Sequence, residues 1–136
     1  MRALARVAPV ALALCVVGCA GSTDGSARAV AERFLDQHYV RIDLEAARTL
    51  TEGLATAKID KEIELTSEIE IDAETRQPSI YYSLDFAEEA GDVASFQYHL
   101  QISAGGVSPY LKLVLLTVRR TDAGWRVTNY SEADPP

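Results

Sequence analysis

Cysteine is scarce in this chain of 136 residues, with two copies at positions 15 and 19. The sequence after residue 19 therefore contains no thiol, which excludes a disulfide and a thiol redox site from that region of the protein. A domain of roughly 110 residues can instead derive its stability from a packed apolar core. We expect packing alone to hold the fold together.

Histidine is equally rare, and the motifs of several common active sites are missing. The chain has two histidines, and it contains neither an H-x-x-x-H nor a C-x-x-C motif. No glycine-rich phosphate loop follows a predicted strand, and no G-x-S-x-G elbow is present. These absences argue against a metal site, a nucleotide cofactor and a serine hydrolase. We assign no catalytic residue, no metal ligand and no cofactor.

The apolar run at the N-terminus is short. It extends from Val7 to Val17, is interrupted by Pro9, and follows Arg2 and Arg6. A helix of this length cannot span the ~30 Å of hydrocarbon in a bilayer. A positive segment followed by a short apolar segment is typical of a secretory signal peptide, which targets the chain and is then removed.

The residues Val16-Val17-Gly18-Cys19 end this run and resemble the lipobox at which bacterial lipoprotein precursors are lipidated and cut. The resemblance implies a signal peptide over residues 1–18 and a lipidated Cys19, whose acyl chains hold the protein on a membrane. The small residues that follow, to residue 25, form a flexible tether. Ala20 stands where an aspartate is associated with inner-membrane retention, so we expect the outer membrane, facing the periplasm, in a host with two membranes. The alternative is a secreted protein that is cut elsewhere and keeps Cys19 as a free thiol.

Basic residues are outnumbered, with 13 Lys and Arg against 20 Asp and Glu. Removal of Arg2 and Arg6 with the signal peptide leaves 11 against 20, a net charge of about −9 with neutral histidines. Such an acidic protein is a poor partner for nucleic acid, and flat contact with anionic lipid is also disfavoured. We expect no nucleic-acid partner.

Three segments of the first half show helical patterns. Residues 26–39 carry an apolar stripe with Ser26 as a cap, and residues 43–53 predict a second, short helix that Asp43 caps. Residues 55–67 favour a third helix, followed by an acidic irregular loop to Pro78. A strand remains the alternative for the end of this segment, because four aliphatic residues alternate with polar ones. They are Ile63, Leu65, Ile69 and Ile71.

From residue 79 onward the apolar period changes to two, which predicts four antiparallel strands. Turn signals at 88–92, 105–109 and 121–124 separate the strands. The strand at 110–120 is apolar on both faces, as a central strand would be, and residues 125–131 form the last strand. The first two strands place these side chains on one inner face: Ile80, Tyr82, Leu84, Phe86, Ala94, Phe96, Tyr98, Leu100 and Ile102.

Three short patterns in this order resemble the NTF2-like, cystatin-like superfamily. They are Phe34-Leu35-x-x-x-Tyr39, Asp43-Leu44-Glu45-Ala46-Ala47 and Gly124-Trp125-Arg126-Val127. The resemblance implies an α+β cone over residues 26–136, in which N-terminal helices pack on a curved antiparallel four-stranded sheet. This chain departs from many members in lacking an extra strand before the meander. Families on this fold include isomerases and dehydratases with a pocket in the cone, as well as many non-catalytic modules, so the fold does not choose between them.

A pocket in such a cone would be lined by residues at the end of the first helix and on the inner sheet face. The candidates are His38, Tyr39, Tyr82, Phe96 and Tyr98. The plainer interpretation is that His38 is a hydrogen-bonded core histidine and that the aromatic residues are simply core. Isomerases of this family use a buried carboxylate base, but the carboxylates of the meander lie on its outer face or in a turn. These are Asp85, Glu88 and Glu89.

These patterns predict a membrane-anchored lipoprotein that acts as a binding or protein-interaction module. The alternative is a small lyase or isomerase in which His38 meets Tyr82 or Tyr98 in an open cavity, and a small-molecule ligand is compatible with both. The strand at 110–120 carries two apolar rows, and helices can cover one of them. The uncovered row would mark an interface with a second copy or with an envelope protein. The two rows are Leu111, Leu113 and Leu115, and Val114, Leu116 and Val118.

Overall fold

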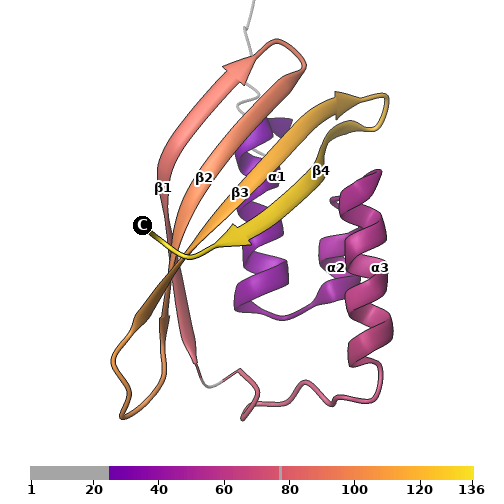
Figure 1. Cartoon of the computed structure of the whole chain (residues 1–136). Coiled ribbons are helices and arrows are strands. Elements are labelled where there is room, and N and C mark those ends of the chain that lie inside the picture. Colours follow the sequence, from indigo (N-terminus) through magenta and orange to yellow (C-terminus); the bar gives the residue numbers. More distant parts are fainter. Residues whose placement is uncertain (1–24, 77) are drawn as a thin grey trace, which may run out of the picture.

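The computed structural model describes residues 25–76 and 78–136 (Figure 1). The expected signal peptide, the expected lipidation site Cys19 and residues 20–24 of the tether lie outside the described residues. The helices are α1 (Ala27–Leu35), the π-helical turn η2 (Asp36–Val40), α2 (Leu44–Arg48) and α3 (Leu54–Thr66). The strands are β1 (Ser79–Ala90), β2 (Val93–Ser103), β3 (Tyr110–Thr121) and β4 (Gly124–Ala133).

Among the described residues, no helix is both long enough and apolar enough to cross a membrane.

Helix α1 begins where the sequence predicts. The Ser26 hydroxyl accepts the N–H of Ala29 at 3.0 Å, which satisfies one of the donors left free at a helix start. The prediction of a regular helix to Tyr39 is wrong at its end, because the N–H of Arg41 donates to the carbonyl of Asp36 at 2.9 Å and closes a π turn. The buried stripe of α1 comprises Ala27, Val30, Ala31, Phe34 and Leu35.

Helix α2 is shorter than predicted. Asp43 caps it by accepting the N–H of Ala46 at 3.0 Å, but the helix ends at Arg48 and not near Gly53. The reason is a tertiary contact: the carbonyl of Leu50 and the N–H of Glu52 each form a 2.9 Å hydrogen bond with Val127 of β4. Thr51 of this segment forms an isolated parallel bridge with Val127 of β4. The bridge lies before the meander, where the sequence predicted that an extra strand would be absent.

Helix α3 extends from Leu54 to Thr66, which agrees with the helical interpretation of residues 55–67 and not with the strand alternative. Its inner residues, Ala55 and Ile59, are fully buried. The spacing of Leu54 in the sequence matches the apolar face of the predicted second helix. In the structure, Leu54 is instead the first residue of α3, and its side chain is exposed. The chain then crosses the open end of the molecule as an irregular segment before β1 begins (Figure 1).

The four strands form an antiparallel meander in the order β1-β2-β3-β4. The turn predicted at 88–92 is in fact shorter. Ala90 pairs with Val93, so Gly91 and Asp92 alone make the turn, and Glu88 and Glu89 belong to β1. Gly91 has a φ of 62°, a conformation that glycine adopts without strain in two-residue hairpins.

The helices cover one face of the sheet, as expected for an α+β layer, and no helix of residues 25–76 or 78–136 covers the other face (Figure 1). The core lies between the two layers and is built from residues between 27 and 130 of the described chain. Its buried sheet residues are Ala94, Phe96, Tyr98, Leu100, Val114, Leu116, Val118, Val127 and Tyr130.

Phe86 is the one member of the predicted inner row that points the other way. Leu84 pairs with Tyr98, but Phe86 pairs with Gln97, so Asp85 is an extra residue in a β-bulge. One extra residue reverses the faces of the side chains beyond it. Phe86 therefore lies on the outer face, where 55% of it is exposed, and its assignment to the inner face is wrong.

Candidate functional site

The structure separates the five candidate pocket residues into two clusters. The ring of His38 contacts the rings of Tyr39 and Tyr130 at centroid distances of 4.3 and 5.3 Å. The ring of Tyr98 instead contacts those of Tyr82 and Phe96, at 6.0 and 6.3 Å. The enzymatic alternative requires His38 to meet Tyr82 or Tyr98, whereas the sheet tyrosine that contacts its ring is Tyr130 of β4.

The first cluster is organised by the carboxylate of Glu62 in α3. One carboxylate oxygen is 2.7 Å from Nε2 of His38 in η2. The other accepts a short hydrogen bond from the hydroxyl of Tyr130 in β4. Lys58 lies over the ring of Tyr130 at 5.3 Å and donates to the backbone carbonyl of the same residue at 2.7 Å. One helix, one π turn and one strand are therefore joined through a single ionised group.

Glu132, near the end of β4, has a similar structural role. It accepts a hydrogen bond from the hydroxyl of Tyr39 at 2.9 Å and another from Nζ of Lys112 in β3 at 2.9 Å. In both Glu62 and Glu132, each of the two carboxylate oxygens has one hydrogen-bond partner. The cluster is a closed hydrogen-bond network and not a set of unpaired acids.

The hydrogen bonds decide the ionisation of these groups. Burial acts to raise the pKa of Glu62, but its imidazole and phenol partners outweigh burial and hold the pKa below its usual value. Burial likewise opposes the effect of Lys112 and Tyr39 on Glu132, whose pKa is also lowered. Burial, followed by the neighbouring carboxylates, raises the pKa of Tyr39 and of Tyr130. None of these carboxyl and phenol groups is suited to exchange protons near neutral pH.

The remaining chemical feature of the cluster is Nδ1 of His38. If Nε2 donates to Glu62, Nδ1 carries a free lone pair, and it is buried without a hydrogen-bond partner among the described residues. A carboxylate that orients an imidazole is also found where histidine acts as a base. Here, however, the imidazole is packed between the rings of Phe34, Tyr39 and Tyr130. A substrate atom would have to displace one of these rings to reach Nδ1.

The second cluster lies beside α1 and centres on Glu32. The hydroxyls of Tyr98 and Tyr82 make long hydrogen bonds, of 3.4 and 3.5 Å, to the side chain and the backbone carbonyl of Glu32. Arg28 pairs with the same carboxylate at 2.8 Å. Burial, and then the charge of Glu32, raises the pKa of Tyr98. With Phe96 and Tyr98 both fully buried, this region of the inner face is packed core.

Sequence reasoning missed Glu62, Tyr130, Glu132 and Lys112, the residues that hold His38 and Tyr39 in place. Nothing in the local pattern distinguishes Glu62 from the other glutamates of its acidic segment. Its partners lie 24 and 68 positions away along the chain. A single sequence gives no signal for contacts at such separations.

The uncovered face of the sheet carries the row that the sequence singled out in β3. Leu111 and Leu115 are 47% and 43% exposed, whereas Leu113 is shielded by its neighbours in the sheet. The bulge in β1 adds Phe86 opposite Leu115, since both residues pair with Gln97 of β2. We call this surface the outer-face patch: Tyr81, Phe86, Leu111, Leu113 and Leu115.

The polar side chains between the members of the outer-face patch are paired with one another. Gln97 donates to the carboxylate of Asp85, the bulged residue, and Nε2 of His99 lies 3.3 Å from the same carboxylate. These side chains alternate with the leucines across the sheet, because Gln97 pairs with Leu115 and His99 pairs with Leu113. A polar strip on β2, whose Gln97 and His99 both contact Asp85, therefore runs between the apolar residues of β1 and those of β3.

No protein-family model matches the sequence, and no curated protein sequence matches it. Solved structures do match the fold. A domain of unknown function with a cystatin-like fold from Nostoc punctiforme aligns with a TM-score of 0.61 and 13% identity over 80% of this chain and 75% of that one. A putative calcium/calmodulin-dependent protein kinase type II association domain from Thiobacillus denitrificans aligns with a TM-score of 0.59 and 12% identity, covering 80% and 94% of the two chains.

An NTF2-like protein of unknown function from Pseudomonas putida gives a TM-score of 0.53 at 14% identity, over 79% of this chain and 83% of that one. At such identities the likeness concerns the fold and not the chemistry. With its helices on one face of an open four-stranded antiparallel sheet, residues 25–136 form an α+β domain of the NTF2-like, cystatin-like fold.

Proposed function

We propose that this chain is a lipid-anchored interaction module of the bacterial envelope, and that it associates with a second copy of itself through the outer-face patch. The observation that carries the proposal is the exposure of Phe86, Leu111 and Leu115 on a sheet face that no described helix covers. Apolar residues gathered on one face mark interaction sites more often than scattered ones do.

The electrostatics of the patch suit a symmetric contact. In an isologous dimer each residue meets the surface patch of its copy, so unpaired charges of one sign at the centre would repel. The acidic Asp85 is already paired with Gln97 and His99, which lowers that repulsion. One structural relative is described as an association domain, and a role in assembly for this fold is in keeping with that description.

The competing proposal is a small lyase or isomerase that uses His38 as its base. The unpartnered Nδ1 of His38 and its orienting carboxylate, Glu62, favour this alternative. The rings of Phe34, Tyr39 and Tyr130 around the imidazole argue against it, because a base must lie within hydrogen-bond reach of its substrate. The interaction module is therefore the function that the geometry supports better.

The test of self-association is the sedimentation of residues 25–136, a chain that retains all the described core residues. We expect a concentration-dependent dimer for the unaltered domain and a monomer for the double substitution Phe86→Ser and Leu115→Ser. The matched control is Leu65→Ser, which removes an exposed leucine of α3, far from the patch in the fold, and should leave the dimer intact. A domain that sediments as a monomer at every concentration would contradict the proposal.

A further inference from the structure

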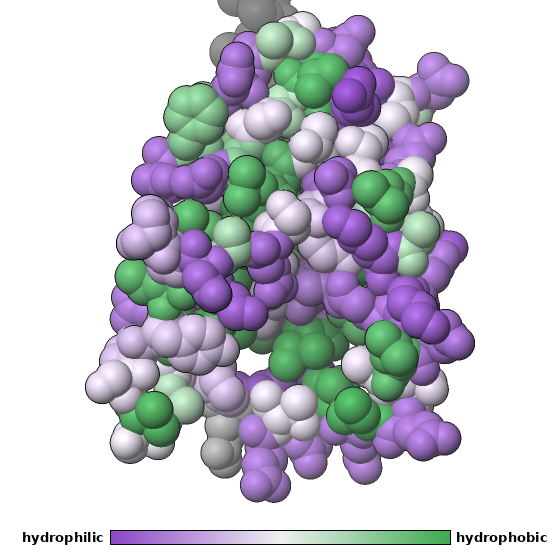
Figure 2. All heavy atoms as spheres, in the orientation of Figure 1, coloured by the Kyte–Doolittle hydropathy of each residue, from purple (hydrophilic) through white to green (hydrophobic). Residues whose placement is uncertain are grey.

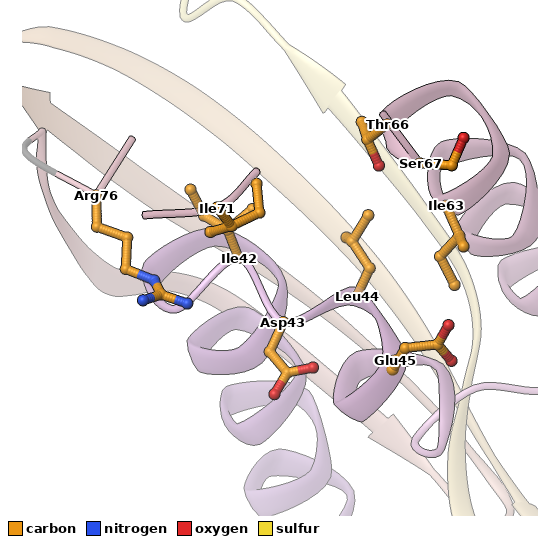
Figure 3. Close-up of a pocket in the computed structure, with 9 residues that line it drawn as sticks. All are labelled: Ile42, Asp43, Leu44, Glu45, Ile63, Thr66, Ser67, Ile71 and Arg76. Atoms are coloured by element: carbon orange, nitrogen blue, oxygen red, sulfur yellow. The ribbon is translucent and has the colours of Figure 1, made fainter. Parts of the chain in front are cut away.

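We propose that a cavity at the open end of the helical layer binds a small aliphatic carboxylate. The cavity has a volume of about 320 Å³ and lies where α2 begins, α3 ends and the segment between α3 and β1 crosses the molecule (Figure 3). Figure 2 shows an opening at this end of the molecule with hydrophobic side chains beside it. The cavity is lined neither by the His38 cluster nor by the outer-face patch, so this inference goes beyond the proposed function.

The wall of the cavity is aliphatic and comes from four separate segments. Ile42 belongs to the link between η2 and α2, Leu44 to α2, Ile63 to α3, and Ile71 to the segment before β1. Figure 3 shows Ile42 beside Ile71, with Leu44 and Ile63 across from them. A volume of this size with a largely apolar wall is within the range of small-molecule sites, roughly 300–1,000 Å³.

Ile42 provides a second observation that does not depend on the volume. Its φ is 53°, in the left-handed region, where a residue with a branched Cβ is strained. The N–H of Asp43 donates to the carbonyl of Gln37 at 2.8 Å and so closes the end of the helix. In this type of helix end, glycine usually occupies the position that Ile42 has here. Because isoleucine occupies this strained position, its side chain forms part of the cavity wall, whereas a glycine would contribute no side chain there.

Arg76 supplies the group that selects a carboxylate. Its Nε donates to the carbonyl of Arg41 at 3.0 Å, which holds the guanidinium at one side of the cavity. A guanidinium binds a carboxylate through two parallel hydrogen bonds. The hydroxyls of Thr66 and Ser67 donate to backbone carbonyls of their own helix, at 2.7 and 3.0 Å, and are already engaged.

Two acidic residues also line the cavity, and their placement limits their effect. Asp43 is engaged as the cap of α2. Glu45 lies on the side of the cavity opposite Arg76, with the aliphatic residues between them (Figure 3). A ligand with its carboxylate on Arg76 and its chain over Ile42, Ile71 and Ile63 therefore keeps its charge away from Glu45.

The experiment is a titration of residues 25–136 with decanoate, at concentrations below micelle formation, followed by the methyl NMR signals of the isoleucines and leucines. We expect saturable shifts at Ile42, Ile63 and Ile71. Arg76→Gln should weaken binding about tenfold or more, as loss of a charged hydrogen-bond pair implies. The matched control is Arg119→Gln on β3, which makes the same change of charge and should bind as the unaltered domain does. Glu45→Gln should bind decanoate at least as tightly.

Two analogues of decanoate, one uncharged and one positively charged, make the result decisive. Decanol should bind more weakly than decanoate, and decylammonium should bind most weakly of the three. Equal or tighter binding of either analogue would overturn the assignment of a carboxylate ligand. Absence of saturable shifts, or shifts confined to the outer-face patch around Phe86 and Leu115, would overturn the site itself. Neither outcome bears on dimer formation, so the two proposals fail separately.

Discussion

At the scale of single residues, Glu62 links elements that are far apart in the sequence. It joins His38 of η2 to Tyr130 of β4, and both of its oxygens are occupied. The lowered pKa of Glu62 means that the ionised carboxylate is more stable in the folded state than in the unfolded state. The same holds for Glu132, which Tyr39 and Lys112 stabilise. Stability should therefore depend on pH through these two groups.

The sign of this dependence follows from the direction of the shifts. A carboxyl with a lowered pKa in the folded state contributes stability above its unfolded pKa, about 4.3 for glutamate, and loses it as the pH falls through the folded value. We expect the free energy of unfolding of the unaltered domain to fall below about pH 5. Glu62→Gln should cost about 1–3 kcal/mol at pH 7, because His38 and Tyr130 lose an ionised partner, and should flatten the acid dependence.

Urea unfolding at pH 7 and at acidic pH measures both effects. The control is Glu64→Gln on the same helix, since Glu64 is an exposed residue that pairs only with Lys61 among the described contacts. It should change little at either pH. If Glu62→Gln left the domain as stable and as sensitive to acid as before, the network around Glu62 would not have the role that its geometry indicates.

At the scale of elements, β3 shows how one strand serves both layers. Its side chains alternate between the core and the outer face, and the neighbours Leu115 and Leu116 differ widely in burial. Leu116 is 1% exposed, whereas Leu115 is 43% exposed. The bulge at Asp85 extends the outer row into β1 by turning Phe86 outward. Strand alternation and one bulge together produce the outer-face patch.

The pair Leu115 and Leu116 therefore makes a matched test of the two faces. Leu116→Ala should cost about 2–5 kcal/mol, because it removes buried methyl groups and leaves a cavity. Leu115→Ala should cost below about 1 kcal/mol in a monomeric sample, because water already reaches that side chain. Chemical unfolding of dilute protein gives both values. Equal losses would mean that the helices do not cover the face on which the structure places them.

At the scale of the whole molecule, the two ends differ. Helix α1 begins at one end, and the segment between α3 and β1, with the cavity beside it, lies at the other (Figure 1). The proposed anchor, Cys19, lies six positions before Gly25, where the described chain begins. An anchor at Cys19 would thus hold the start of α1 nearest the membrane and leave the cavity on the far side.

The anchor is tested by Cys19→Ser in the full chain. We expect this variant to be released from the membrane or to remain unprocessed, whereas the unaltered protein should fractionate with the outer membrane in a host that has two. The control is Cys15→Ser, which removes the other cysteine of the N-terminal segment but leaves the lipobox and should remain anchored. Normal cleavage of Cys19→Ser together with full retention on the membrane would contradict lipid anchorage.

Local patterns in the sequence were enough to predict the order of the helices and strands. The apolar spacing in residues 27–35 and in residues 94–102, and the caps Ser26 and Asp43, are local features, and each acts within a few residues of itself. The rows of β3 could be read in the same way, because side chains of a strand alternate whatever it packs against. For this reason the α+β architecture followed from pattern alone.

Packing between distant segments decides where these patterns stop and which side chains meet. Helix α2 ends early because residues 50–52 bond to Val127, and Phe86 turns outward because the register with β2 shifts at Asp85. Both changes involve a strand outside the segment concerned. The hydrogen bonds of Glu62 with His38 and Tyr130 depend on packing in the same way. They join residues 24 and 68 positions apart, so they form only when whole elements pack together, and local sequence does not specify them.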